Sequence, residues 1–536
     1  MAYVITPGCC SDASCVAVCP VDCIHPSPGE PDFGRTATLF VDPRSCIDCG
    51  ACADACPVDA IGPADLLKGG PDEVFIERNA EFFTDRPVND GGSEPSFPTT
   101  LPASVPQLNV AIVGTGPAAY YTADLLLRIA GAEVTMFDRL PVSGGLLRYG
   151  VAPDHPATKK LADRFTGFRH NPRLQLMLGV EVGVDISPAE LAAHFDAVIY
   201  AVGASASKSL GIVGEDLVGS LSATEVVAWY NGHPDAIELP VKLDHDRAVL
   251  IGNGNVALDV ARILLVGPDA LATTDIADQA LVALASSDVT EVVIAARRGP
   301  EHAAYTGGEL HNLTRLPGVD VVVADTPALH QARSIDDAQA RLVADLPVVE
   351  LGSRPEPGRR RIVFAFGLTP QQLHGGPQVE SITFATADEP VTVEAGLVVR
   401  AIGYAGRPLS GLPFDTDTGM IPNEHGRIVE HGRPKPGEYV VGWIKRGATG
   451  GIGANRQDAA DTMRAVLEDA VAGRLTGAAG SARHWRAQLR RRFPQLVDKR
   501  GLRAIEQAEL SRGRAQGRVR VKLSSRAELL QAARER

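Results

Sequence analysis

The chain has 536 residues, 45% of them hydrophobic and 22% charged, and its formal net charge is −13. This composition is that of an average soluble globular protein, and the length predicts roughly three to four domains. No apolar run reaches the ~18 residues that span a bilayer, and the first residues lack the charged and apolar regions of a signal peptide. We therefore expect a cytoplasmic protein without a membrane partner.

All nine cysteines lie between Cys9 and Cys56. In a chain without an export signal, such a cluster indicates metal ligation rather than a disulfide scaffold. The run CIDCGACADACP has the spacing C-x2-C-x2-C-x3-C-P of the bacterial two-cluster ferredoxins, in which three thiolates bind one iron-sulfur cluster and the fourth binds the other. Zinc, the competing metal, needs paired CxxC or Cys/His knuckles, which this run does not form.

The run CCSDASCVAVCP repeats this spacing with Asp12 where the second cysteine should stand. A carboxylate is a harder and weaker ligand for iron than a thiolate, so this second cluster should be labile. We expect either a [3Fe-4S] cluster or a [4Fe-4S] cluster with Asp12 or solvent as its fourth ligand. The predicted ligands are Cys19, Cys46, Cys49 and Cys52 for the [4Fe-4S] cluster, and Cys9, Asp12, Cys15 and Cys56 for the labile one.

Two cysteines remain outside these sets. Cys10 follows a ligand and would replace Cys9 only if the loop shifted, and we expect Cys23 to be a buried free thiol close to a cluster. With its PVDCI run and NAEFF ending, the segment 1–83 resembles the seven-iron bacterial ferredoxins, which have a longer first spacing. This resemblance implies an N-terminal α+β ferredoxin domain.

Residues 84–107 are rich in Pro, Ser and Gly and have no periodicity, which predicts a linker. In the rest of the chain strands alternate with helical segments, a pattern typical of parallel α/β sheets. The run NVAIVGTGPAA places Gly114, Gly116 and Ala119 after a strand, in the G-x-G-x-x-A form of a dinucleotide-binding turn. The next strand ends in Asp138, where an acid can bind the ribose hydroxyls of an ADP moiety.

A second copy reads RAVLIGNGNVALDVARIL, with Gly252, Gly254 and Ala257 in the same roles. After its partner strand, EVVIAARRGP, the acid is replaced by Arg297 and Arg298. A guanidinium pair at this position suits a 2′-phosphate, so this site should prefer NADP(H) to NAD(H). A solvated arginine pair is the alternative interpretation.

The strands DAVIYAVGA and LVVRAIGY flank the second copy, so we expect the second nucleotide domain to be inserted into the first. This is the α/β architecture of disulfide-reductase-like flavoproteins with two dinucleotide-binding domains, although no CxxC follows Cys56 for disulfide chemistry. The basic tail interleaves Lys and Arg with Leu and Ala at helical spacing and lacks stacking aromatics, which favours helices over nucleic-acid binding. The predicted domains are 1–83 for the ferredoxin, 84–107 for the linker, 108–225 and 401–479 for the FAD-binding domain, 226–400 for the NADP-binding domain, and 480–536 for the basic extension.

The runs VGTGPAAYYTAD, LLRYGVAPDH, GNGNVALDVARIL, ARRGP and YVVGWIKRGATGGIGAN resemble the adrenodoxin reductase family of NADPH:ferredoxin reductases. This resemblance implies FAD and NADP(H) as cofactors; the family commonly has Glu where Asp138 stands. The implied FAD contacts are Gly114, Gly116, Ala118, Ala119, Asp138, Leu146, Val182, Trp443, Gly450, Gly451 and Ile452. The implied NADP contacts are Gly252, Asn253, Gly254, Asn255, Val256, Arg297, Arg298, Glu309 and Gly450.

Together these features predict an NADPH:ferredoxin oxidoreductase. A nicotinamide gives two electrons as a hydride and an iron-sulfur cluster accepts one at a time, so a flavin between them is the adaptor. The final acceptor would be a ferredoxin or another one-electron acceptor such as a cytochrome P450 system. His155 and Glu309 are candidates for proton movement or pocket polarity, although such residues are more often structural. The competing hypotheses are an electron-wire subunit of a larger complex, like that of glutamate synthase, and a binding protein with degenerate sites.

Overall fold

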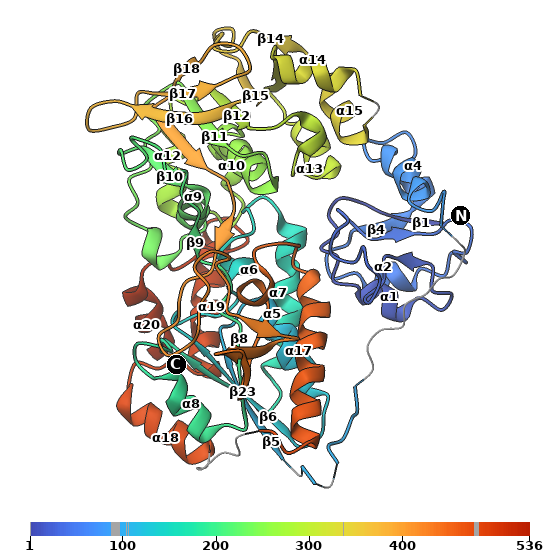
Figure 1. Ribbon diagram of the computed structural model, residues 1–536, viewed down its shortest axis with the longest axis vertical. Coiled ribbons are helices and arrows are strands. Elements are labelled where there is room, and N and C mark those ends of the chain that lie inside the picture. Colours follow the sequence, from blue (N-terminus) through green and yellow to red (C-terminus); the bar gives the residue numbers. More distant parts are fainter. Residues whose placement is uncertain are drawn as a thin grey trace.

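The computed structural model describes residues 2–86, 97–102, 104–105, 107–335, 337–475 and 482–535. The expected linker lies outside the described residues at 87–96, 103 and 106. The chain forms a small Cys-rich body and two larger α/β bodies, each built on a seven-stranded sheet (Figure 1). None of the described helices combines the length and the apolar character needed to cross a bilayer.

The Cys-rich body contains two copies of one small unit. In each copy a short helix begins after a residue in the left-handed region, Ala13 or Gly50, and ends at an extended cysteine, Cys19 or Cys56. Because these backbone angles match, the internal repeat of the sequence is also a repeat of structure. The strand pairs are β1 (Tyr3–Ile5) with β4 (Ile61–Pro63) and β2 (Ile24–His25) with β3 (Phe40–Val41), and the helices are α1 (Ser14–Val18), α2 (Ala51–Ala55), α3 (Ala64–Leu67) and α4 (Val74–Glu81).

The first α/β body carries the first glycine fingerprint. The strand that leads into this fingerprint is an almost fully buried apolar run, as expected for a parallel strand with helices on both faces. The sheet order is β21 (Asn423–Glu424), β22 (Arg427–Glu430), β23 (Arg433–Val440), β8 (Ala197–Tyr200), β5 (Leu108–Val113), β6 (Ala132–Asp138) and β7 (Leu174–Leu178). Its helices are α5 (Pro117–Leu127), α6 (Leu146–Tyr149), α7 (Pro156–Phe168), α8 (Pro188–His194), α16 (Trp443–Arg446) and α17 (Ala454–Val471).

The second α/β body carries the second fingerprint, and each neighbouring pair of strands in its described sheet is parallel. The sheet order is β10 (Ser220–Ser222), β19 (Leu397–Arg400), β11 (Arg247–Ile251), β12 (Glu291–Ala296), β15 (Arg360–Phe366), β13 (Val319–Ala324) and β14 (Val348–Val349). A smaller sheet holds β16 (Thr369–His374), β17 (Ser381–Ala385) and β18 (Val391–Glu394). The helices are α9 (Ala223–Tyr230), α10 (Asn255–Leu265), α11 (Pro268–Leu271), α12 (Asp278–Ala285), α13 (Gly307–Leu313), α14 (Pro327–Arg333) and α15 (Ala338–Ala344), with short 3-10 turns at Pro234–Ala236 and Pro300–His302.

Two strands join the α/β bodies where the second is inserted into the first. These are β9 (Ala206–Ser207) and β20 (Tyr404–Ala405), which pair antiparallel. The strand β10 belongs to the second sheet although it precedes residue 226, so that sheet begins slightly before the predicted boundary.

The basic C-terminal segment folds into three helices, α18 (Ala482–Arg492), α19 (Lys499–Ala515) and α20 (Arg526–Arg534), which pack on the first α/β body. The segment also supplies ion pairs that reach both α/β bodies. Glu509 pairs with Arg148, with exposed side-chain fractions of 0% and 8%, and Lys522 lies 3.0 Å from Asp275 of the second body. The basic tail is therefore structural rather than a free arm.

Candidate functional site

The two fingerprint turns are built in the same way. Gly114 and Gly252 have φ values of 109° and 108°. A Cβ on either would overlap a carbonyl oxygen beyond the neighbouring strand, that of Ala201 or Ala401. Glycine is therefore required at both positions, and both turns bring backbone amides and a helix N-terminus to the edge of the sheet, as a pyrophosphate requires.

Most of the predicted FAD residues come together at the first turn. Gly145, just before α6, lies so close to Gly116 that a Cβ there would be 2.8 Å from the Gly116 Cα. A Cβ added to Gly442, just before Trp443, would likewise lie 2.8 Å from the Ala118 Cβ. Segments far apart in the sequence thus form one narrow cradle at the N-terminus of α5, where added side-chain atoms would clash.

Asp138 ends β6 beside this turn. Its carboxylate accepts hydrogen bonds from the Thr115 N–H (3.0 Å) and hydroxyl and from the Leu140 N–H (3.0 Å). Burial raises the pKa of Asp138 and these donors oppose the rise. The carboxylate therefore fixes the turn and keeps further lone pairs for ribose hydroxyls. Val182 is buried nearby, after Val180, whose N–H donates to the Asp138 carbonyl (3.0 Å).

An acid that the motifs did not reveal holds the Trp443 turn. Asp458 of α17 is 6% exposed and accepts a hydrogen bond from the Gly442 N–H. It also pairs with Lys445 (2.9 Å) and Arg446 (3.0 Å). The sequence feature that could have identified Asp458 is an acid on the inner face of a helix, four residues after the helix begins.

Trp443 is tied to the glycine-rich segment that follows it. Its indole N–H donates to the Thr449 carbonyl (3.2 Å). Next along the chain, Gly450 and Gly451 are exposed and Ile452 is half-buried, just ahead of α17. This segment therefore remains accessible to a bound dinucleotide.

The second turn is fastened to the loop before α13. The Asn253 side-chain oxygen accepts the Ala304 N–H (3.4 Å), and that of Asn255 accepts the Thr306 N–H (2.8 Å). Val256 packs on the core of the second body. The NADP residues predicted around Gly252 and Gly254 and on α13 thus belong to one connected surface.

Arg297 and Arg298 directly follow β12 and are both exposed. Within the part of the chain that the structure describes, neither guanidinium has an ion pair or a hydrogen bond. Two unpartnered cations at the end of the strand next to the fingerprint strand are suited to bind an anionic group.

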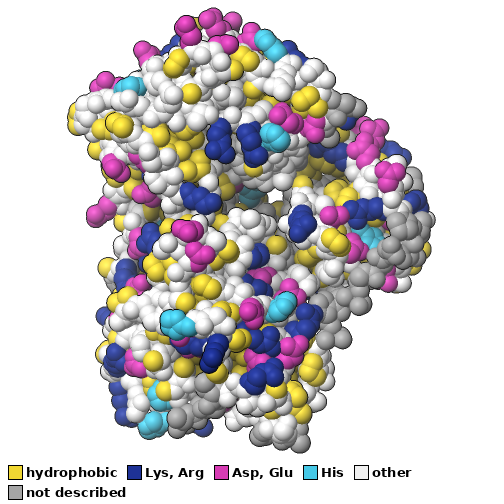
Figure 2. All heavy atoms as spheres, viewed as in Figure 1, with side chains coloured by type: hydrophobic (Ala, Val, Ile, Leu, Met, Phe, Trp, Pro, Cys, Tyr) yellow, Lys and Arg dark blue, Asp and Glu magenta, His cyan; other side chains and the backbone are white. Residues whose placement is uncertain are grey.

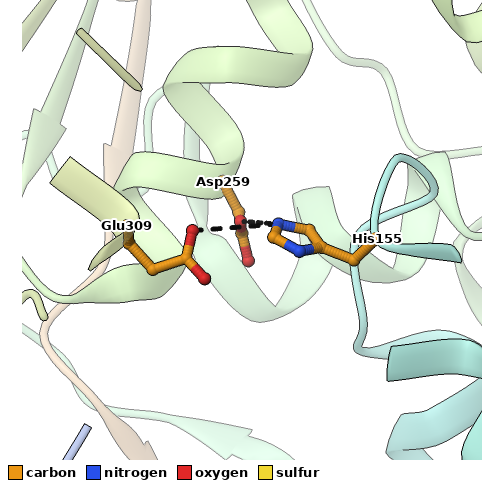
Figure 3. A group of neighbouring side chains, drawn as sticks. All are labelled: His155, Asp259 and Glu309. Carbon is orange, nitrogen blue, oxygen red and sulfur yellow. Dashed lines mark hydrogen bonds and ion pairs between the residues drawn. The ribbon is translucent and has the colours of Figure 1, made fainter. Parts of the chain in front are cut away.

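His155, Asp259 and Glu309 meet between the two α/β bodies (Figure 3). His155 precedes α7 of the first body, whereas Asp259 lies on α10 and Glu309 on α13 of the second. The His155 Nε2 is 3.1 Å from the Asp259 Oδ1 and 3.9 Å from the Glu309 Oε2. The structure therefore brings both predicted catalytic residues together and adds Asp259.

Arg262 supplies the positive charge of this group. Its guanidinium lies 2.6 Å from both Asp154 and Asp259, contacts His155, and is 3.9 Å from the Glu309 Oε2. Because this cation lies among the carboxylates, a metal ion at the same place would meet its repulsion.

Two members of the group have shifted pKa values. Burial alone would lower the pKa of His155, but the hydrogen bond and charge of Asp259 outweigh it, and the net shift is upward. Burial raises the pKa of Glu309, whose Oε2 is buried and has no hydrogen-bond partner among the described residues. Both shifts favour the protonated forms, so the group can hold a proton.

The cysteines form two groups, and each group contains residues from both cysteine motifs. Near Asp12, burial raises the pKa of Cys15, and the charges of Cys9, Asp12 and Cys56 raise it further. Thiols that oppose one another's ionisation in this way need a cation to become thiolates, which suits an iron-sulfur cluster. The other group lines one cavity and consists of Cys19, Cys46, Cys49 and Cys52, with Cys23, Tyr3, Val21, Ile47 and Gly50 beside them.

Asp12 occupies the position in the first cysteine motif that Cys49 occupies in the second. It is 4% exposed, and its carboxylate accepts hydrogen bonds from the Ser14 N–H (3.1 Å) and the Ser14 hydroxyl. Cys49 is exposed. Ser14 would compete with iron for the Asp12 oxygens, which favours a labile corner.

The two spare cysteines differ in their surroundings. The Cys23 Sγ is buried and 3.4 Å from the Cys19 Sγ, so it lies next to the ligands of one predicted cluster. Cys10 packs against the core of the first α/β body, and burial raises the pKa of its thiol.

Comparison with known proteins places these features in context. The family described as pyridine nucleotide-disulphide oxidoreductase matches residues 108–359, and the 4Fe-4S binding domain matches residues 39–62. A probable ferredoxin/ferredoxin–NADP reductase of Mycobacterium tuberculosis is 46% identical over 99% of this chain and 95% of its own length. The NADPH-ferredoxin reductase FprA of Mycobacterium leprae is 43% identical over 79% of this chain and 97% of its own. The structure of Mycobacterium tuberculosis FprA in complex with NADPH is similar at a TM-score of 0.73 and 41% identity, covering 80% of this chain and 99% of that one.

Proposed function

The chain belongs to the family of ferredoxin/ferredoxin–NADP reductases, and we propose that it oxidises NADPH and delivers the electrons singly, through its own clusters, to a ferredoxin or another one-electron acceptor such as a cytochrome P450 system. In each turnover NADPH loses a hydride and becomes NADP+, two acceptor molecules gain one electron each, and one proton is released. The observation that carries this proposal is that one chain holds two dinucleotide turns and two cysteine groups. These are the parts required to convert two-electron into one-electron transfer.

The first α/β body fits FAD because its turn is a cradle that only glycines leave open, with Asp138 at its edge. When bound, FAD supplies the conversion between hydride transfer and one-electron transfer. The chain itself orients the dinucleotide. Its binding residues in this proposal are Gly114, Gly116, Ala118, Ala119, Asp138, Leu146, Val182, Trp443, Gly450, Gly451 and Ile452.

The second α/β body fits NADP(H) because Arg297 and Arg298 are free to bind the 2′-phosphate. We assign His155 and Glu309 to holding a proton where the two bodies meet, with Asp259 and Arg262 orienting them. The other binding residues in this proposal are Gly252, Asn253, Gly254, Asn255, Val256 and Gly450.

The Cys-rich body would hold two clusters. Cys19, Cys46, Cys49 and Cys52 have the donor set and the shared cavity for a [4Fe-4S] cluster. The group of Cys9, Cys15 and Cys56 has three thiols and the Asp12 carboxylate, which suits a [3Fe-4S] cluster or a labile [4Fe-4S] cluster.

In this proposal the protein is cytoplasmic, and each predicted segment has a role. The ferredoxin spans 1–83, the linker 84–107, the FAD-binding domain 108–225 and 401–479, the NADP-binding domain 226–400, and the C-terminal extension 480–536.

The isolated chain distinguishes this proposal from an electron-wire subunit. It should reduce both ferricyanide and cytochrome c with NADPH alone, because it contains a complete path. If it oxidises NADPH only after a larger partner is added, the wire hypothesis is correct instead.

A further inference from the structure

The start of α17 is seated on the first cysteine loop, residues 9–15. The Gly453 N–H donates to the Cys10 carbonyl (3.0 Å), and the Arg456 guanidinium donates to the Asp12 carbonyl (2.7 Å). Gly453 directly follows the glycine-rich segment assigned to FAD, and Arg456 lies in the first turn of α17. The loop therefore touches the first α/β body at its flavin-binding face.

Gly453 is glycine because of this contact. Its φ of −64° is open to any residue, so its own backbone does not require glycine. A Cβ there would instead overlap the Ser11 carbonyl of the Cys-rich body. The atoms that such a Cβ would meet most closely all belong to Ser11 and Asp12.

The two cysteine groups consequently face different surroundings. In the loop against α17, Ser11 and Asp12 are 8% and 4% exposed. In the second loop, the matching residues Asp48 and Cys49 are both exposed, and Ile47 is 59% exposed. One group faces the first α/β body and the other opens toward solvent.

A second contact fixes this orientation. The His311 Nε2 of α13 is 3.2 Å from the Pro71 carbonyl, and its ring packs edge-on against Phe75 at 5.4 Å. The Cys-rich body therefore touches both α/β bodies and lies as a lobe against their flank (Figures 1 and 2). If the Cys-rich body were turned so that the second cysteine loop faced α17, the contacts with α17 and with His311 would both be lost.

We infer that electrons enter the Cys-rich body at the group of Cys9, Asp12, Cys15 and Cys56 and leave from the group that includes Cys49, and that Gly453 and Arg456 are the positioning residues that hold the receiving loop. The inference rests on the proposed function. Each of the two electrons taken from one NADPH passes singly through the receiving group to the exposed group and then to one acceptor molecule.

The test compares Gly453→Ala with Gly167→Ala in the full chain. Gly167 lies within α7 of the same body, and a Cβ there meets no atom of the described residues within 4 Å, so it is a matched control. Amide hydrogen exchange of residues 9–18 reports docking, anaerobic stopped-flow absorbance reports the rate of cluster reduction by NADPH, and ferricyanide reduction with FAD content reports the flavin half. We expect Gly453→Ala to raise exchange in residues 9–18 and to slow cluster reduction by about tenfold or more, since small misplacements of reacting partners cost at least this much. Ferricyanide reduction and FAD content should stay unchanged, and Gly167→Ala should match the unmodified chain.

Three outcomes would overturn the inference. Raised exchange with unchanged cluster reduction would show that this docking is not the route, and unchanged exchange would show that the contact is absent in solution. Loss of FAD in Gly453→Ala would make Gly453 part of the flavin site instead, while leaving the proposed function intact.

A second pair of variants checks the same point, because Arg456→Ala should slow cluster reduction and Arg456→Lys, which keeps a donor, should recover part of the rate. Failure of the unmodified chain to reduce ferricyanide with NADPH would refute the proposed function itself.

Discussion

The Glu309 Oε2 lies 3.9 Å from the His155 Nε2, so two side chains from different α/β bodies meet at one point. His155 is bonded on the same nitrogen to Asp259, on the helix that follows the second fingerprint. The junction of the two bodies is therefore polar and titratable, and its protonation should be coupled to how the bodies are held together.

Replacing His155 by Gln should reduce stability mainly at acidic pH. The pKa of His155 is raised in the folded chain, so its stabilising effect is complete below the unfolded pKa of about 6.5 and is lost as the pH rises through the higher folded value. A net loss of about 1 kcal/mol for this partly exposed hydrogen bond corresponds to a Tm lower by about 2–4 °C at pH 6 for an unfolding unit of roughly 200 residues, with little difference at pH 9. Thermal unfolding of the two proteins at both pH values measures this. His302→Gln, on an exposed histidine, is the control, and an equal loss for His155→Gln at both pH values would show that His155 is neutral.

Replacing Arg297 and Arg298 by Ala should abolish the preference for NADPH. Each guanidinium can make a charge-assisted contact worth ~1.5–3 kcal/mol to the 2′-phosphate, so kcat/KM for NADPH should fall on the order of 100-fold or more while that for NADH changes little. Arg315→Ala, at another exposed arginine of the same body, should leave the ratio of the two values unchanged. Equal efficiency with NADH and NADPH in the unmodified chain would contradict the assignment.

Replacing Glu509 by Gln should destabilise the whole reductase part. Arg148 would then be left as a buried charge without its partner, which typically costs about 3–5 kcal/mol. Asp461→Asn breaks the exposed pair with Arg464, 3.3 Å apart, and should cost no more than ~1 kcal/mol. Denaturant unfolding compares the two variants. If Glu509→Gln is as mild as the control, α19 is not a structural part of the first body.

Replacing Asp12 by Cys should change the type of one cluster. The substitution restores the full cysteine spacing, so an air-oxidised [3Fe-4S] EPR signal should give way to a stable [4Fe-4S] cluster. Cys10→Ser is the control, because Cys10 lies in the same loop and packs against the core of the first α/β body but is outside the predicted ligand set. The assignment fails if the three-iron signal survives Asp12→Cys and disappears in Cys10→Ser.

Much of the fold and site follows from local sequence rules. Gly114 and Gly252 are recognisable because a tight turn after a strand admits only glycine, and the backbone repeat at Cys19 and Cys56 follows from the repeated cysteine spacing. These features depend on neighbours in the chain, so spacing alone predicts them.

Other features depend on contacts between distant segments. Arg456 meets the Asp12 carbonyl, and Asp458 holds the Trp443 turn, but neither residue belongs to a motif. The meeting of His155 with Asp259 likewise requires knowledge of how the two α/β bodies pack. Such partners are set by tertiary packing, which one sequence does not encode in a local pattern.

The most direct test of the account compares NADPH-dependent cytochrome c reduction by the full chain and by a chain lacking residues 1–107. Ferricyanide reduction and FAD content serve as the control, because a small inorganic oxidant can take electrons from the flavin half alone. We predict that the shortened chain keeps ferricyanide reduction and loses most of its cytochrome c reduction. If it reduces cytochrome c as fast as the full chain without added ferredoxin, the fused clusters are not the path by which electrons leave.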